Sequence, residues 1–406
     1  MDISKVESQS NKNKSLTRWR NLIAFWILGL CNNYGFTIVV SAAKDILHDQ
    51  FNDGNNSTWN DGENLRDCNK LSTGAMLLAN ILPCLIVKLT VPFLPFYVRL
   101  RITVCVVTSA LGLLSIALGD TKFLTIFGVV LGSISTGLGE ISILPFLHKY
   151  AKENITSWSS GTGASGIVAA MAYTALKTIL STKHTILIML IVPLAQAIAF
   201  GLILVPPNDK LIINADNTDK QQPPKKTILK KVSLLPRLWI YYVPLGLVYF
   251  FEFFINMGLY ELVQFDKIWL DSKEQYRWLH TVYQIGVFIS RSSTTFITFD
   301  RVWPMTVFQF VNVLYFGVEV IYYVTPSIWI VFAITLWEGL LGGGAYVNTF
   351  CKMSDEITPD DLRDSLGIVT FADALGITLA SWAAIGVHPE ICKMPRPTNR
   401  FQFSNS

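Results

Sequence analysis

Residues 276–299 read YRWLHTVYQIGVFISRSSTTFITF, an apolar stretch of helical length that carries Arg291 about two-thirds of the way along. A helix needs about 20 apolar residues to cross the hydrocarbon layer of a bilayer. An arginine at membrane depth costs about 2.5 to 3.5 kcal/mol on insertion scales. The stretch therefore predicts a membrane helix in which some partner compensates the charge of Arg291.

Composition extends this prediction to the whole chain. Of its 406 residues, 51% are hydrophobic and only 15% are charged, and the mean hydropathy is +0.40. Soluble domains contain about 25% charged residues. The net charge of +4 is spread among the loops, so it informs orientation in a bilayer and does not indicate a nucleic-acid partner. We expect a polytopic membrane protein whose surroundings are the lipid bilayer.

Apolar stretches of spanning length recur along the chain and predict an all-α bundle of about eleven transmembrane helices. The predicted spans are residues 22–43, 72–91, 102–119, 123–147, 160–181, 184–205, 238–260, 278–299, 303–324, 327–350 and 366–387.

Polar segments divide these spans into two groups. Lys and Arg are more frequent on the side of the N-terminus, which predicts a cytosolic N-terminus. The polar loop 44–71 is then luminal, and its sequons make Asn55 and Asn56 predicted glycosylation sites. The predicted units are an N-terminal tail at 1–21, a six-helix half at 22–205, a flexible Pro-rich cytosolic linker at 206–237, a five-helix half at 238–387 and a tail at 388–406.

Matched features suggest that the two halves are homologous. The first and seventh spans each contain Asn-x-Gly, at Asn33 and Asn256, and the fourth and tenth each contain a glutamate in a glycine-rich helix, at Glu140 and Glu338. Parallel repeats of this kind build major facilitator folds, in which the substrate binds between the halves near the midplane. We expect the same location here.

Ionisable residues inside the predicted spans are candidate functional groups, because such residues face a bundle interior or an aqueous path. Lys88 and Lys177 lie near span ends, where we expect them to snorkel to the interface. For Arg291 a structural ion pair with a glutamate stays open as an alternative to substrate binding, and the same holds for Glu140. The interior set is Glu140, Glu252, Arg291, Glu319, Glu338 and Asp373.

Glu252 and Asn256 are four residues apart and so share one face of a helix, with Glu261 following near the end of the span. A transporter uses such a polar face to titrate a proton or to bind substrate hydroxyls. Arg291 binds phosphate or carboxylate through its planar fork. We therefore expect an anionic or zwitterionic small-molecule substrate with hydroxyls, and proton coupling stays open. The candidate substrate-binding residues are Arg291, Glu252, Asn256, Glu140, Glu338, Asn33 and Asp373.

Enzyme classes fit poorly. The five histidines form no HExxH pair, the chain has no GxSxG elbow, and GTGASG at 161–166 opens a membrane helix and follows no strand. The six cysteines form no CxxC and no Cys/His metal spacing. We expect no enzyme activity, no cofactor, no metal and no disulfide framework.

Several long motifs resemble those of the battenin family. They run from the first span to the last: FWILGLCNNYGFTIVVSAAKDIL (25–47), GLGEISIL (137–144), WSSGTGASG (158–166), YFFEFFINMGLYELVQF (249–265), YRWLHTVYQIGVFISRSS (276–293), WEGLLGGGAYVNTF (337–350) and DALGITLA (373–380). The human member of this family of lysosomal or vacuolar membrane proteins is lost in juvenile neuronal ceroid lipofuscinosis.

The resemblance implies a late endosomal, lysosomal or vacuolar location and a fold similar to major facilitator and equilibrative nucleoside transporters. It also implies roles in luminal pH, in basic amino acid balance and in clearing glycerophosphodiesters. Vertebrate members end in a CaaX box, whereas Cys392 is followed here by KMPRPTNRFQFSNS, so no terminal lipid anchor is expected. The resulting hypothesis is an exporter of glycerophosphodiesters. A membrane regulator of trafficking or of proton pumping, with structural buried charges, is the alternative.

Overall fold

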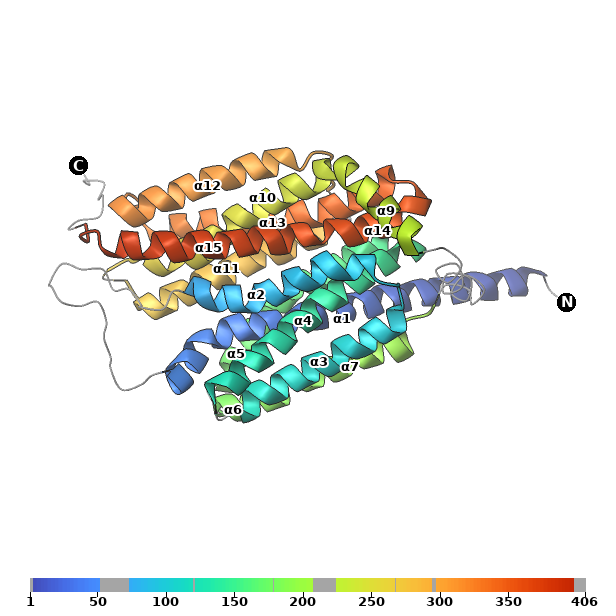
Figure 1. Ribbon diagram of the computed structural model, residues 1–406, viewed down its shortest axis with the longest axis horizontal. Helices are drawn as coiled ribbons and strands as arrows, with labels where there is room; N and C mark the ends of the chain where they lie inside the picture. The colour runs from blue at the N-terminus through green and yellow to red at the C-terminus, as the bar shows by residue number, and fades with distance from the viewer. Residues whose placement is uncertain are drawn as a thin grey trace.

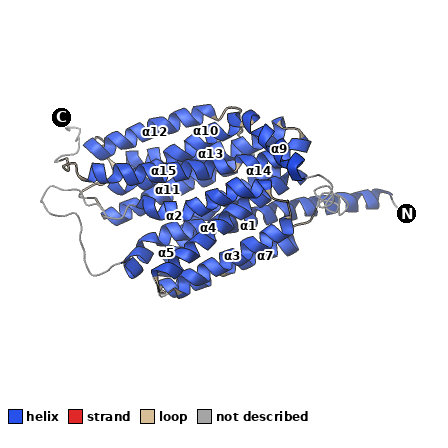
Figure 2. Ribbon diagram, in the orientation of Figure 1, coloured by secondary structure: helices blue, strands red, loops and turns tan. Residues whose placement is uncertain are grey.

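Helices make up almost all of the chain that the structure describes. The computed structural model describes residues 3–51, 73–119, 121–177, 179–206, 224–266, 268–293 and 297–397. Figure 2 shows helices joined by short loops, and no strand occurs within these ranges. The predicted all-α class is confirmed.

The first half of the bundle contains the elements up to residue 203. Apolar side chains such as Phe25, Leu28, Leu144 and Trp158 form part of its core, and α1 packs along α5 while α3 packs along α4. The elements are α1 (Ile3–Phe51), α2 (Thr73–Thr90), η1 (Val91–Phe93), α3 (Val98–Leu118), α4 (Lys122–Phe146), η2 (Leu147–Lys149), α5 (Glu153–Lys177), α6 (Thr182–Ile188), α7 (Ile191–Ile198) and η3 (Ala199–Ile203).

The second half begins at residue 239, with α11 packed along α13 and α10 along α15. Its elements are α10 (Trp239–Phe254), η5 (Ile255–Leu259), η6 (Tyr260–Leu262), α11 (Ser272–Ser293), α12 (Trp303–Tyr322), α13 (Ile328–Glu356), α14 (Pro359–Val369) and α15 (Phe371–Cys392). At the end of α12, Tyr323 has φ 54, and Glu319 accepts a hydrogen bond from the Thr325 backbone N–H at 2.8 Å, which closes the turn.

Eight of the described helical segments are long and apolar enough to cross a membrane. The predicted number of eleven is not confirmed. Each remaining predicted span does correspond to a helix of the bundle, but α2 has a short apolar part, and α5 and α11 are rich in Ser, Thr and charged residues. α5 and α11 pack against each other between the halves. A helix that buries a polar face in this way has a low mean hydropathy, so neither helix is apolar enough to count as a span by composition.

The halves meet along two helix pairs, α5 with α11 and α2 with α15. In Figure 1 the helices of both halves run roughly parallel, and α9 and α14 lie at the end of the bundle where α1 begins. α15 ends at the opposite side. The interface between the halves therefore runs through the middle of the bundle, where the predicted substrate site would lie.

The predicted flexible linker is helical from residue 224 onward. Within 206–237, residues 224–237 form α9 (Pro224–Leu234) and η4 (Leu235–Arg237). Lys230 pairs with Asp361 of α14 at 2.6 Å, and Lys231 donates to the Pro92 carbonyl at 2.8 Å. The basic C-terminal part of the linker is held against the bundle because acidic residues of α14 supply the opposite charges.

Cys392 at the end of α15 is disulfide-bonded, whereas no disulfide framework was expected from the sequence. The last helix extends five residues beyond the predicted boundary at 387, so Cys392 lies at a helix end where it can meet another segment. Cys31, Cys84, Cys105 and Cys351 are free and buried, as expected for small core residues.

Candidate functional site

Arg291 is buried between the two halves, and its direct hydrogen-bond and ring partners are neutral groups. Its side chain leaves α11 with an exposed fraction of 7%. Nη1 donates to Thr162 Oγ1 of α5 at 2.6 Å, and Nη2 donates to the Tyr249 hydroxyl of α10 at 2.7 Å. The guanidinium carbon lies 4.3 Å from the ring centroid of Tyr346 in α13, a cation–π contact. Among the described residues, Arg291 forms no ion pair, and its Nε has no hydrogen-bond partner.

Glu252 lies near Arg291 but bonds to a different residue. Its carboxylate accepts a hydrogen bond from the Tyr283 hydroxyl of α11. Since α10 and α11 run antiparallel, Tyr249 reaches Arg291 while Glu252, one turn further along α10, reaches Tyr283. The alternative of a direct ion pair between Arg291 and a glutamate is therefore not realised between these two described residues. Glu252 Oε2 is buried without a hydrogen-bond partner.

Gly342 of α13 makes room for this carboxylate. A Cβ at Gly342 would lie 2.1 Å from Glu252 Oε2, and a Cβ at Gly343 would lie 2.6 Å from the Val287 carbonyl of α11. At Gly344 the nearest atom is 3.5 Å away, on Met305. The LLGGGAY segment therefore combines tight helix packing, as expected from its small residues, with space for a polar group.

Lys88 does not snorkel to the interface, which corrects the prediction from its place near the end of α2. It is 2% exposed, and its Nζ lies 2.8 and 2.9 Å from the two Asp373 oxygens and 2.6 Å from Glu140 Oε2. Two carboxylates from α4 and α15 direct it inward, because a buried ammonium needs such partners. We call Lys88, Glu140 and Asp373 the lysine cluster.

Tyr346 joins the lysine cluster to Arg291. Its hydroxyl donates to Glu140 Oε1 at 2.6 Å, and its ring lies beneath the guanidinium. Lys88, Glu140 and Thr162 belong to the first half, whereas Asp373, Tyr346 and Arg291 belong to the second. The network therefore bonds the two halves together at several points, and any relative motion of the halves must change it.

Two further candidate residues are buried in the second half with unsatisfied polar atoms. Glu338 accepts a hydrogen bond from the Tyr260 hydroxyl, while its Oε1 has no partner. Asn256 lies in the π-helical turn η5, and neither polar atom of its side chain has a partner among the described residues. Such turns occur frequently at functional sites. Glu252, Asn256 and Glu338 thus present polar atoms that a polar ligand could satisfy.

Asn33 stands apart from these residues. It is half-buried in α1, and its backbone carbonyl accepts a hydrogen bond from Thr37 at 3.2 Å. The adjacent Asn32 is the buried one, and it donates to the Thr136 carbonyl at 3.2 Å. Asn55 and Asn56, the predicted glycosylation sites, lie outside the described residues.

Several residues of the network were missed from the sequence, chiefly the partners Lys88, Tyr249 and Tyr346. One signal was available for Lys88: the predicted spans contain five carboxylates and one arginine, and an excess of buried acids calls for a further cation. The tyrosines gave no such signal, because aromatic residues are common throughout the spans.

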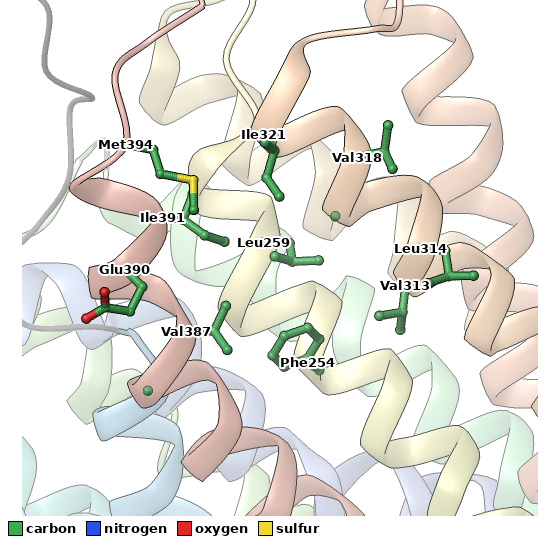
Figure 3. Close-up of a pocket in the computed structure, with 12 residues that line it drawn as sticks. Phe254, Leu259, Val313, Leu314, Val318, Ile321, Val387, Glu390, Ile391 and Met394 are labelled. Carbon is green, nitrogen blue, oxygen red and sulfur yellow. The ribbon is translucent and has the colours of Figure 1, made fainter.

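An apolar cavity of about 510 Å³ lies away from this network, between α10 with η5, α12 and α15. Figure 3 shows Phe254, Leu259 and Val387 on its wall, with Glu390 at one side. Glu390 pairs with Lys393 at 2.6 Å. Because the wall of this cavity is hydrophobic, the cavity suits an apolar molecule. We therefore do not assign the expected anionic substrate to it.

Comparisons with known proteins identify the family. The family model described as "CLN3 protein" matches residues 23–228 and 208–394. Battenin of the dog, Canis lupus familiaris, is 38% identical over 93% of this chain and 92% of its own length. Protein BTN1 of Yarrowia lipolytica is 32% identical over 91% of this chain and 94% of its own length.

Solved structures show which fold the chain adopts. The human organic anion transporter MFSD10 (TETRAN) gives a TM-score of 0.60 at 11% identity, covering 92% of this chain and 94% of that protein. The proton:xylose symporter XylE gives 0.59 at 14% identity, covering 93% and 90%. Both belong to the major facilitator fold, so the resemblance to battenin and the predicted fold class are confirmed. The chain belongs to the CLN3 protein family of battenins and is a multi-pass membrane protein with a major facilitator fold.

Proposed function

We propose that this protein exports a small anionic metabolite, foremost glycerophosphodiesters, from an endolysosomal compartment to the cytosol. One observation carries the proposal: the buried guanidinium of Arg291 lies between the halves and is held by hydroxyls and an aromatic ring. A buried cation whose described partners are neutral can attract an anion strongly, because the surroundings have a low dielectric constant.

The chemistry of a glycerophosphodiester suits these groups. Its phosphate bears one negative charge that the planar fork of Arg291 can bind through two oxygens. Its hydroxyls can satisfy the unpartnered polar atoms of Glu252, Asn256 and Glu338. The battenin resemblance implies clearance of this substrate class, with effects on luminal pH and basic amino acid balance.

The direction of export rests on a cytosolic N-terminus. Cys392 is disulfide-bonded and is the last residue of α15, which ends on the side of the bundle opposite the start of α1. Disulfides persist in oxidising compartments and are rare in the cytosol. The end with Cys392 would therefore be luminal, in agreement with the positive-inside prediction. Late endosomal, lysosomal or vacuolar residence follows from the battenin resemblance.

Flux through purified protein in proteoliposomes tests the proposal. Wild-type protein should move radiolabelled glycerophosphoglycerol across the membrane, whereas protein-free liposomes should not. Limited proteolysis of the same vesicles reports the fraction of correctly oriented protein. Folded, oriented protein that moves no labelled diester would favour a regulator of trafficking or proton pumping, in which the buried charges are structural.

A further inference from the structure

The lysine cluster contains one buried ammonium and two buried carboxylates. Lys88 Nζ lies 2.8 Å from Asp373 Oδ1 and 2.6 Å from Glu140 Oε2. With all three groups ionised, the cluster by itself has a net charge of −1, and Arg291 beyond the Tyr346 ring can offset this charge only while no anion is bound to Arg291. An uncompensated charge in a buried site is unfavourable, and the usual remedy for a carboxylate is to take up a proton. The chemistry of the cluster thus suits a proton as its ligand.

The lysine cluster also crosses the interface between the halves. Lys88 and Glu140 lie in α2 and α4, whereas Asp373 lies in α15. When the halves move apart at the lysine cluster, Lys88 can remain paired with Glu140 of the same half, while Asp373 moves away with the other half. Asp373 then loses its cation, and a proton is the ligand that neutralises it. Proton occupancy of the cluster is therefore tied to the arrangement of the halves.

The other buried carboxylates lack this property. Glu252 bonds to Tyr283 and Glu338 bonds to Tyr260, and all four residues belong to the second half. A rigid movement of one half against the other leaves these pairs unchanged. Glu252 and Glu338 can bind protons. Their described hydrogen bonds do not change when the halves move, so this motion gives no means of releasing the protons.

A short path connects the lysine cluster to the anion. The Tyr346 hydroxyl donates to Glu140, and its ring faces the guanidinium of Arg291. An anion at Arg291 adds negative charge on the other side of this ring, which favours a proton on Glu140 or Asp373. Other titratable or charged side chains that act on the cluster are Cys84, Tyr249, Glu252, Arg291 and Tyr346.

We propose that the lysine cluster is the proton-binding site of this transporter and takes up one proton with each anion bound at Arg291. The inference rests on the proposed anion transport. The proton comes from the compartment to which the site is open, adds to a carboxylate oxygen of Glu140 or Asp373, and leaves on the other side with the anion. The pair of anion and proton crosses without adding net charge to the interior.

Calorimetry of anion binding counts this proton. Purified protein in detergent is titrated with glycerophosphoglycerol at one mildly acidic pH, in two buffers with different ionisation enthalpies. The difference in heat gives the protons taken up per anion. Wild-type protein should take up about one, so its affinity should rise by about tenfold for each unit by which the pH falls.

Two variants and a control make the test specific. Glu140→Gln and Asp373→Asn each leave Lys88 one carboxylate partner, which keeps a balanced buried pair and favours folding; both should reduce proton uptake towards zero. Glu319→Gln removes a buried carboxylate of α12 outside the cluster and should retain the wild-type uptake. Thermal unfolding verifies that each protein is folded.

The outcomes separate this inference from the proposed function. Wild-type protein that binds no diester overturns the proposed function, and the proton linkage with it. Normal binding with undiminished proton uptake in both Glu140→Gln and Asp373→Asn leaves anion transport intact and overturns the lysine cluster as the proton site. In that case, Glu252 or Glu338 would be the group that takes up the proton.

Discussion

Arg291 remains charged inside the bundle although its described partners are hydroxyls and a ring. The hydrogen bonds to Thr162 and Tyr249 and the contact with Tyr346 offset part of the desolvation of the guanidinium. None of them neutralises its charge. A structural ion pair would do so, which is why the geometry favours binding of an anion over a purely structural role.

Removing one hydroxyl that holds the guanidinium should weaken substrate binding. Hydrogen bonds to charged groups contribute about 1.5 to 3 kcal/mol, so Tyr249→Phe should raise the KM for diester flux by roughly tenfold to a hundredfold. Tyr322→Phe alters an exposed tyrosine of α12 and serves as the control. An unchanged KM in Tyr249→Phe would mean that Tyr249 does not position Arg291 for the substrate.

Neighbouring glycines of α13 offer a test of the space around Glu252. Gly342→Ala introduces a Cβ where Glu252 Oε2 now lies, and the carboxylate must move because it is the flexible end of a side chain. We expect reduced diester flux with nearly normal thermal stability. Gly344→Ala meets its nearest neighbour at 3.5 Å and should retain flux. Equal flux in the two variants would show that the position of Glu252 is unimportant for transport.

At the scale of the element, glycines allow α11 and α13 to approach closely. A Cβ at Gly286 would lie 2.4 Å from the Leu336 carbonyl, whereas a Cβ at Gly317 of α12 would have no atom within 4 Å. Overpacking of this kind costs about 1 to 3 kcal/mol. Gly286→Ala should therefore lower the thermal unfolding temperature, and Gly317→Ala should leave it near that of the wild type. The same temperature for both variants would contradict the close packing of α11 and α13.

The sequence predicts the elements better than it predicts their contacts. Apolar length located the long helices of the bundle, because a membrane imposes a minimum span, but it missed α9 and α14; the battenin motifs led to the correct family. The sequence did not reveal that Lys88 faces inward, since the direction of this side chain depends on carboxylates more than 50 residues away in α4 and α15. It also left open whether a glutamate pairs with Arg291, because the choice of Tyr249 for Arg291 and of Tyr283 for Glu252 depends on how the helices are placed in the bundle.

At the scale of the whole molecule, contacts between the halves lie near the end with α9 and α14. Lys152, which directly precedes α5, pairs with Asp355 near the C-terminal end of α13, and Thr156 approaches Cys351 Sγ at 3.9 Å. Ser160 and Ser292 share a hydrogen bond of 2.9 Å a little further in. These contacts hold the halves together at this end, which an alternating-access transporter must release in its cycle.

Cysteine labelling can detect this release. Cys351 is 3% exposed, so it should react slowly with a membrane-impermeant maleimide. Lys152→Glu replaces an exposed ion pair by a repulsion of about 1 kcal/mol, which should increase labelling of Cys351 by about fivefold. The charge swap Lys152→Asp with Asp355→Lys should restore the slow rate. Peptide mass spectrometry provides the measurement, and an unaltered rate in Lys152→Glu would mean that this pair does not hold the end closed.

Diester flux in Arg291→Gln proteoliposomes tests the central claim most directly. We predict that labelled glycerophosphoglycerol no longer crosses the membrane although the variant is expressed, folded and oriented like the wild type. Wild-type flux in Arg291→Gln would contradict the claim. So would loss of folded Arg291→Gln protein that is restored by adding Glu252→Gln, because that rescue would identify Arg291 as one partner of a structural charge pair.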